Sequence, residues 1–209
     1  RFKDSNFDTR LLKKLQNADY ILISIPPQGK KDLVLKRFKK NLKSLNFKKL
    51  IYLSATSVYG NHNGKWVSEN SKLKGKTLFG IRRIAAEKAW IDFKKLSGLD
   101  INILRVSGIY SKESNVLKKI SKKNIYVKDK KFFSRIRIED LAVVIKKMFF
   151  SSRSSMILNA SDDKPSTNVE VAKFAAKLLK IKYLHAVPIF KFKNKMIKQF
   201  YKDSKKRKK

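Results

Sequence analysis

Cysteine is absent from the 209 residues of this sequence, which excludes disulfide bonds, thiolate metal sites and a cysteine nucleophile. Histidine is almost absent too: His62 and His185 are too few for an imidazole-rich centre, so we expect no metal site. No apolar run approaches the roughly 18 residues of a membrane span, and no apolar signal segment follows Arg1. These absences predict a cytoplasmic protein with neither a bound metal nor a membrane partner.

Acidic residues are scarce as well. Only 16 Asp and Glu oppose 52 Lys and Arg, and the formal net charge is +36. Such a charge is compatible with binding to nucleic acid. Lysines, however, outnumber arginines about four to one and are spread along every segment, and lysine lacks the bidentate fork with which arginine reads bases and phosphates. A biased composition is therefore the favoured interpretation, and nucleic acid is a disfavoured partner.

Glycine is limited to seven residues, and none of them forms the phosphate-cradling GxGxxG turn. What the sequence does contain is three short apolar runs, at residues 20–25 (YILISI), 50–53 (LIYL) and 101–106 (INILRV). Runs of this length are typical of strands that are buried on both faces of a parallel sheet. We therefore predict three such strands at the centre of the fold.

Helices are expected between and after these strands, because apolar residues recur there with a period near that of a helix. The predicted helices span residues 31–45, 78–96 and 138–150, and another follows the capping box Thr167–x–x–Glu170. Thr77 is the expected N-cap of the second helix and Gly98 its C′ residue. The inner stripe of this helix is predicted to comprise Ala86, Ala89, Trp90, Phe93 and Leu96.

The predicted fold class is α/β, with a Rossmann-like parallel sheet flanked by helices and a small mixed α/β part at the C-terminus. Residues 1–124 are expected to form the sheet domain, and residues 125–190 a smaller subdomain interleaved with it. Residues 191–209 are expected to form a basic tail that ends in the like-charge block KDSKKRKK, which we predict to be disordered.

The candidate site lies where the second strand ends. The run at residues 50–53 leads directly into Ser54, Ala55, Thr56 and Ser57, and then into the sequence VYG. Ligands of open α/β sheets collect at the carboxyl ends of the strands. A strand that runs into a small, hydroxyl-rich turn therefore marks the place where chemistry is expected.

A long polar surface loop is predicted directly after this turn, over residues 61–76, because the segment contains Gly64 and Gly75 and shows no period. Trp66 within it is a large apolar side chain that needs a partner surface. Two interpretations stay open: Trp66 packs the loop down onto the protein, or it lines a substrate pocket.

Six stretches of the sequence resemble the extended or atypical short-chain dehydrogenase/reductases of the NAD-dependent epimerase/dehydratase family. They are ADYILISIPP, LIYLSATSVYG, FGIRRIAAEKAW, INILRVSGIY, FSRIRIEDLA and ILNASDDKPSTNVEVAKFAAKLL, in the order and at the spacings of that family. The loop GKWVSE at residues 64–69 is similar to the GxWVxE loop of a bacterial branch of atypical NAD(P)-binding proteins. The resemblance implies a Rossmann-like fold and a cofactor that is NAD or NADP.

In this family the dinucleotide fingerprint lies in the first βαβ unit, before a strand like residues 20–25. The resemblance therefore implies that the sequence is an N-terminally truncated piece, which lacks that unit and its fingerprint. The strand at residues 20–25 is then expected to show a bare edge where its neighbour should pair.

The resemblance also points to catalytic positions, at which this sequence departs from the family. The Ser or Thr of the turn corresponds to Ala55, and the Tyr and Lys of the Tyr-x-x-x-Lys pair correspond to Phe79 and Arg83. Phenylalanine has no proton to give, so a tyrosine proton shuttle is not expected. The candidate catalytic residues are therefore Thr56, Tyr59 and Arg83, although Tyr59 is also interpretable as a packed tyrosine of the turn.

Further site residues are expected, most of them because of the resemblance. The cofactor is expected to contact Ile25, Pro26, Pro27, Ser54, Arg83, Ser107 and Ile109. The substrate is expected to contact Trp66, Arg105, Tyr110, Arg135 and Arg137, of which Arg135 and Arg137 are also interpretable as ordinary surface charge.

Three functions are compatible with this sequence. The first is an NAD(P)-binding oxidoreductase-like protein of the epimerase/dehydratase type, which acts on a small carbonyl or sugar-like substrate. The second is a non-catalytic dinucleotide-binding sensor or scaffold, since the Ser/Tyr/Lys set is replaced. The third is nucleic-acid binding through the basic surface. The resemblance further implies a homodimer that pairs through the helix at residues 78–96.

Overall fold

A four-stranded parallel sheet forms the centre of the protein, in a computed structural model that describes residues 9–29, 31–123, 125–127, 131–182 and 184–187. The strand order is β1-β2-β3-β8. The strands are β1 (Tyr20–Ile23), β2 (Lys49–Ala55), β3 (Ile101–Val106) and β8 (Ile157–Ala160). Every neighbouring pair is parallel, with Ile21 opposite Leu50 and Tyr52 opposite Ile103. The predicted side-by-side, parallel arrangement of the three apolar runs is confirmed.

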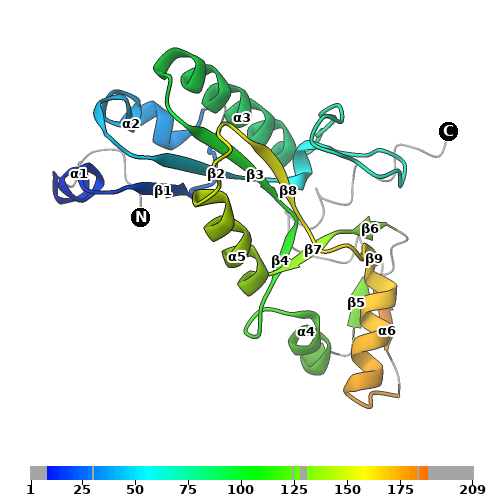
Figure 1. Cartoon of the computed structure of the whole chain (residues 1–209). Coiled ribbons are helices and arrows are strands. Elements are labelled where there is room, and N and C mark those ends of the chain that lie inside the picture. The colour runs from blue at the N-terminus through cyan, green and yellow to red at the C-terminus, as the bar shows by residue number, and fades with distance from the viewer. Residues whose placement is uncertain (1–8, 30, 124, 128–130, 183, 188–209) are drawn as a thin grey trace.

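Helices cover both faces of this sheet (Figure 1). On one face lie α2 (Leu33–Ser44) and α3 (Leu78–Ser97), which bury Phe38, Leu42 and Trp90 against β1, β2 and β3. On the other face lies α5 (Ile138–Phe149), which buries Leu141 and Met148 against residues of β2, β3 and β8. The sheet is thus the middle of three layers, as expected for strands without a polar face.

Local capping explains where α3 begins and ends. The Thr77 side chain accepts a hydrogen bond from the Gly80 N–H at 2.9 Å, and Gly98 adopts a left-handed φ of 71° directly after the last turn. Both predictions from the sequence are confirmed. The inner stripe is confirmed at Trp90 and Phe93 but is wrong at Leu96, which is 71% exposed.

In the described residues, six short strands and two helices build the C-terminal part. Strand β4 (Gly108–Tyr110) pairs in parallel with β7 (Arg135–Arg137), and β6 (Phe132–Phe133) pairs antiparallel with β9 (Ser166–Thr167). Strand β5 (Ile125–Val127) pairs with β10 (His185–Val187). Helix α4 (Val116–Lys123) packs on α6 (Asn168–Leu178) around a small core of Ile120, Ala172 and Ala175. The capping box predicted at Thr167 and Glu170 begins α6.

At the other end of the sheet, β1 follows the helix α1 (Thr9–Gln16). Among the described strands β1 pairs with β2 alone, so its second edge carries no neighbour. Strand β1 also ends at Ile23, two residues earlier than the apolar run suggested. The predicted basic tail at residues 191–209 lies outside the described residues. Within the described ranges, no helix is both long and apolar enough to cross a membrane.

Candidate functional site

The carboxyl ends of β2, β3 and β8 meet at one edge of the sheet, and we call this the carboxyl edge (Figure 1). Strand β2 runs into the short 3-10 helix η1 (Thr56–Val58), and β3 runs into Ser107 and β4. Ser54 and Ser107 are buried there, and within the described residues neither hydroxyl has a hydrogen-bond partner. Unsatisfied buried hydroxyls cost free energy and often mark a place that a ligand or water completes.

The polar loop predicted after this turn is an Ω-loop, which we define as residues 61–74. Its two ends meet because the Lys74 N–H donates to the Tyr59 carbonyl at 3.1 Å and Gly60 bridges to Lys74. Its first turn is of type I′ kind: Asn63 and Gly64 both have positive φ, and the Lys65 N–H donates to the His62 carbonyl. The loop is therefore closed at its base and ordered at its first turn.

Two glycines allow the loop, η1 and the start of α3 to approach closely. A Cβ atom added at Gly60 would lie 2.2 Å from the carbonyl oxygen of Lys74. A Cβ atom at Gly80 would lie 2.7 Å from the carbonyl oxygen of Ser57. These contacts are backbone to backbone, so only glycine fits. The N-terminus of α3, which carries the predicted catalytic positions, is thereby held against the turn after β2.

A buried ion pair lies beneath this turn. Arg105 on β3 and Glu87 on α3 are 4% and 1% exposed. The Arg105 Nη2 donates to Glu87 Oε2 at 2.8 Å, and its Nε donates to both carboxylate oxygens at 3.2 Å. Burial acts to lower the pKa of the Arg105 guanidinium, but the hydrogen bonds and charge of Glu87 outweigh it and raise that pKa. Arg105 is therefore a fixed cation inside the protein.

The remaining nitrogen of Arg105 reaches toward the Ω-loop. Its Nη1 donates to the Tyr59 hydroxyl and to the Glu69 carbonyl, each at 2.9 Å. The Tyr59 hydroxyl in turn donates to Asn159 Oδ1 at 2.6 Å, and the Asn159 N–H donates to Glu69 Oε1 at 2.7 Å. These bonds link α3, β3, β8 and the Ω-loop in one network. They favour the packed-tyrosine interpretation of Tyr59, whose side chain is buried and fully engaged.

A second polar cluster joins α3 to β2. Arg83 is half-buried, and its Nη1 donates to the carbonyl oxygen of Leu53 and, at 3.3 Å, to the Tyr52 hydroxyl. The Tyr52 ring stacks on Trp90 with a centroid distance of 5.5 Å. Burial raises the pKa of Tyr52 to about 12, although the nearby Arg83 cation opposes this rise. Arg83 thus places a positive charge at the end of β2, where the family's lysine is expected.

The other predicted catalytic positions carry no acid. Ala55 and Thr56 are half-buried at the start of η1, and Phe79 is 41% exposed in the first turn of α3. The packing of α3 on η1 keeps these three residues on neighbouring elements. The arrangement supplies a cation and small hydroxyls, but the Phe79 side chain has no O–H group to donate.

Predicted cofactor and substrate residues are spread over the carboxyl edge. After β1, Ile25 is half-buried, Pro26 is exposed and Pro27 is buried. On β4, Ile109 and Tyr110 are both exposed. The register of β4 and β7 sets Tyr110 opposite Arg137.

The two arginines of β7 differ in their surroundings. Arg135 Nη1 donates to the carbonyl oxygens of Phe133 and Ser166, at 3.0 and 3.1 Å, and its Nη2 donates to Asn168 Oδ1. It therefore braces β6, β9 and the start of α6. Arg137 is exposed and pairs with Glu139 at 2.8 Å. Of the two, Arg137 is the one that faces solvent.

Trp66 does not pack the loop down. Its side chain is 80% exposed, so the first of its two interpretations is wrong. The described residues around it leave the indole open to a partner, and its role in binding substrate stays a prediction.

Sequence reasoning did not find Glu87, Glu69 or Asn159. Glu87 lies between Ala86 and Trp90 on the buried side of α3, and a carboxylate on such a stripe requires a cationic partner. That signal was available in the sequence. Asn159 and Glu69 gave no comparable signal, since their contacts join segments 90 residues apart.

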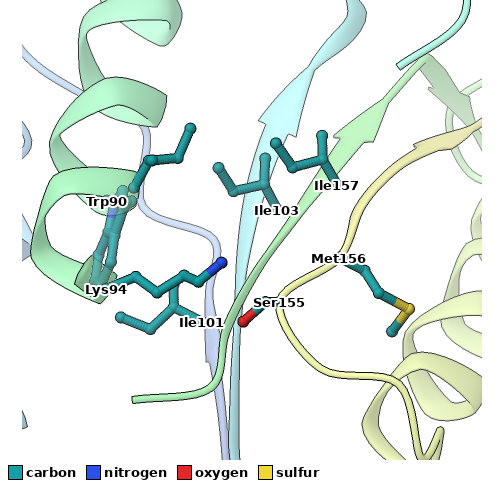
Figure 2. Close-up of a pocket in the computed structure, with 8 residues that line it drawn as sticks. Trp90, Lys94, Ile101, Ile103, Ser155, Met156 and Ile157 are labelled. Atoms are coloured by element: carbon teal, nitrogen blue, oxygen red, sulfur yellow. The ribbon is translucent and has the colours of Figure 1, made fainter. Parts of the chain in front are cut away.

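Two hollows among the described residues lie away from this site. A crevice between α3 and strands β3 and β8 has a volume of about 90 Å³ and is lined by Trp90, Lys94, Ile101 and Met156 among others. Figure 2 shows these lining residues. The crevice is far smaller than the roughly 300–1,000 Å³ of typical ligand pockets. A hollow of about 370 Å³ lies at the amino end of the sheet, next to Tyr20, Lys49 and Phe150. Among the described residues no cluster of His, Asp and Glu could hold a metal ion.

The sequence profile of the NAD dependent epimerase/dehydratase family matches residues 34–138, which is half of the chain and includes α3, the Ω-loop and both residues of the buried ion pair, Glu87 and Arg105. The chain belongs to the NAD dependent epimerase/dehydratase family. A comparison with curated protein sequences gave no match.

Solved structures share the fold of this epimerase/dehydratase family member. A functionally unknown conserved protein from Silicibacter pomeroyi has a TM-score of 0.79 and 29% identity, over 87% of this chain and 65% of its own. The UDP-glucuronic acid 4-epimerase of Bacillus cereus, solved with NAD, has a TM-score of 0.75 and 18% identity over 87% of this chain and 66% of its own. The dTDP-glucose 4,6-dehydratase of Bacillus anthracis, also solved with NAD, has a TM-score of 0.71 and 16% identity over 86% and 63%. The chain thus spans about two thirds of the length of these proteins.

Proposed function

We propose that this chain is part of an NAD(P)-binding oxidoreductase-like protein of the epimerase/dehydratase type, with a small carbonyl or sugar-like substrate bound at the carboxyl edge. The observation that carries this proposal is the convergence of Ser54, Arg83 and Ser107 at the ends of β2 and β3, in a chain that belongs to this family. Relatives with the same fold bind NAD.

The residues at the carboxyl edge fit the nicotinamide–ribose half of such a cofactor. Ser54 and Ser107 offer buried hydroxyls without partners in the described structure, and Arg83 offers a cation beside them. Ile25 and Pro27 offer apolar contacts after β1. When bound, the nicotinamide would supply hydride transfer; these side chains would hold and orient it. The diphosphate half needs a glycine-rich turn, which none of the seven glycines forms.

The whole protein is proposed to supply that turn. A further βαβ unit with the fingerprint would pair with the free edge of β1 and complete the sheet. In this arrangement residues 1–124 belong to the cofactor domain, and residues 125–190 form the substrate-side subdomain. The two parts interleave, because α5 and β8 return to the main sheet while α4 and α6 share a separate core.

A second candidate function is a dinucleotide-binding sensor or scaffold without turnover. Its support is the chemistry of the catalytic positions: Ala55 and Phe79 carry no hydroxyl, and the Tyr59 hydroxyl is engaged by Arg105 and Asn159. If the protein is instead an enzyme, the Thr56 hydroxyl is proposed to face the reacting carbon, and Arg83 is proposed to stabilise negative charge.

Cofactor titration of the full-length protein tests the proposal. Binding of NADH or NADPH is expected to quench tryptophan fluorescence, and Arg83→Met is expected to weaken it about tenfold, or ~1.4 kcal/mol. Lys88→Met, an exposed change on the same helix, is the matched control. No binding at millimolar cofactor would reject both functions. Cofactor binding without hydride exchange on nucleotide-sugar substrates would reject the oxidoreductase function and support the sensor or scaffold.

The proposed partner is a second copy of the protein, paired through α3. Leu78, Ile81 and Leu96 are exposed on this helix although they are large and apolar. Analytical ultracentrifugation of Ile81→Asp beside the wild type tests the pairing. A wild-type protein that sediments as a monomer would reject the proposed dimer.

A further inference from the structure

One buried ion pair is connected to the loop that carries the exposed tryptophan. Trp66 is one of two tryptophans; the other, Trp90, is buried in the core. The Ω-loop that bears Trp66 lies beyond the carboxyl ends of the strands (Figure 1). An indole held in solvent at such a place suggests a partner that the described residues do not provide.

The side-chain nitrogens of Arg105 bond to two different parts of the protein. Its Nε and Nη2 are held by Glu87, at distances of 2.8–3.2 Å. Its Nη1 holds the Glu69 carbonyl of the Ω-loop and the Tyr59 hydroxyl before the loop, each at 2.9 Å. Since the planar guanidinium is rigid, Glu87 sets the direction in which Nη1 points.

The Ω-loop is internally ordered, so a few anchors suffice to fix it. The His62 Nε2 lies 3.1 Å from the Lys72 carbonyl oxygen, which joins the two sides of the loop. The Ser68 N–H donates to Ser71 Oγ, and the Ser71 N–H donates back to the Ser68 carbonyl. Outside its base, the described anchors of the loop are the two contacts of Glu69, with Arg105 and with Asn159.

We propose that Glu87 and Arg105 are positioning residues, which fix the Ω-loop so that Trp66 stacks on the apolar face of a sugar ring bound at the carboxyl edge. The ligand in this inference rests on the proposed function, whereas the fixing of the loop does not. A preformed aromatic platform binds a ring without the entropy cost of ordering a flexible loop.

The first experiment tests the fixing of the loop in the ligand-free protein. Arg105→Lys keeps the charge opposite Glu87 but cannot also reach Glu69, and Glu87→Met/Arg105→Met removes both buried charges together. Such double replacements of buried ion pairs are often close to neutral for stability. Amide hydrogen exchange at Ser68 and Ser71 is expected to speed up roughly tenfold in both variants, while exchange in β2 and β3 stays unchanged.

A purely structural role would give a different pattern. If exchange rises equally in the loop and in β2 and β3, or in neither, the positioning role is overturned. Glu139→Gln breaks the exposed pair with Arg137 and is the control, expected to leave loop exchange unchanged. This result does not depend on any ligand.

The second experiment tests the ligand, with the full-length protein and UDP-glucose as the probe. Trp66→Ala is expected to weaken UDP-glucose binding about tenfold, the ratio that matches the loss of one aromatic stacking contact. Binding of UDP, which lacks the sugar, is expected to change little. Three results would overturn the sugar-stacking assignment, whatever the cofactor titration shows. They are UDP binding that weakens as much as UDP-glucose binding, no weakening of either, and no UDP-glucose binding at all.

Discussion

The ammonium group of Lys49 lies 2.7 Å from the carbonyl oxygen of Ser151, inside the end of the sheet opposite the candidate site. The carbonyl oxygens of Arg153 and Met148 accept from the same nitrogen at 2.9 and 3.3 Å, and Asp100 Oδ2 lies 3.6 Å away. Lys49 is only 5% exposed. A buried cation at the C-terminal end of α5 also meets the negative end of the helix dipole.

Removing this ammonium should destabilise the protein strongly. Lys49→Met is expected to lower the free energy of unfolding by about 2–4 kcal/mol, because three carbonyls and Asp100 lose their partner in a buried place. Urea unfolding measures the effect. Lys48→Met is the control: Lys48 is exposed, pairs with the exposed Asp19, and should have little effect. Equal stability of the two variants would contradict the buried role of Lys49.

Tyr52 should make stability depend on alkaline pH. Its pKa rises from 10.0 to about 12 on folding because burial disfavours the phenolate. Between these values the unfolded chain releases the proton and the native protein retains it, so stability present below pH 10 is lost as the pH rises to about 12. The difference in unfolding free energy between the wild type and Tyr52→Phe should fall by up to about 1.4 kcal/mol per pH unit in that window.

The same group can be observed directly. The ultraviolet absorbance of tyrosinate should show a titration near pH 12 in the wild type that is absent from Tyr52→Phe. If every tyrosine of the folded protein titrates near pH 10, the burial of Tyr52 does not control its ionisation.

The capping box at the start of α6 predicts a smaller effect. Thr167 Oγ1 accepts from the Glu170 N–H at 3.2 Å, and the Glu170 carboxylate accepts from the Thr167 N–H at 2.6 Å. Thr167→Ala should lower stability by about 1 kcal/mol, and Thr167→Ser should retain most of it. Thermal unfolding followed by circular dichroism would check both. A loss shared equally by the serine variant would show that the methyl group matters, not the cap.

Local patterns predicted the elements that depend on local physics. Apolar runs identified β1, β2 and β3, because strands buried on both faces must be apolar along their whole length. The caps at Thr77 and Thr167 bond within three residues of themselves, so the sequence alone contains them. Leu96 was misplaced because helical spacing gives the direction of a side chain but not how far the covering surface extends.

The site was harder to predict because its contacts are distant in sequence. The same holds at the opposite end of the sheet, where Lys49 was one of many lysines in the sequence and its partner Ser151 lies 102 residues later. The sequence left Trp66 free either to pack or to protrude, and only the three-dimensional structure shows that it is exposed. The position of Glu87 on the buried stripe of α3 indicates a cationic partner, but no pattern in the sequence identifies that partner as Arg105, 18 residues later. Sequence reasoning could therefore locate the carboxyl edge but not the network that holds it.

Gly80 tests whether the catalytic positions depend on close backbone packing. Alanine favours helices over glycine by roughly 1 kcal/mol, so Gly80→Ala would stabilise an open helix. Here its Cβ would approach the Ser57 carbonyl to 2.7 Å and the Gly75 Cα to 3.0 Å, contacts too short to tolerate without moving backbone. We expect a net loss of roughly 1–3 kcal/mol, the usual penalty for overpacking.

The matched control is Gly108→Ala, whose nearest contact would be 3.4 Å and whose backbone does not adopt a positive φ. Its stability should remain close to that of the wild type. Gly80→Ala should also weaken cofactor binding, because α3 must shift away from η1 and takes Arg83 with it. If Gly80→Ala is more stable than the wild type, α3 does not pack closely on the turn after β2. The geometry described for the carboxyl edge would then be contradicted.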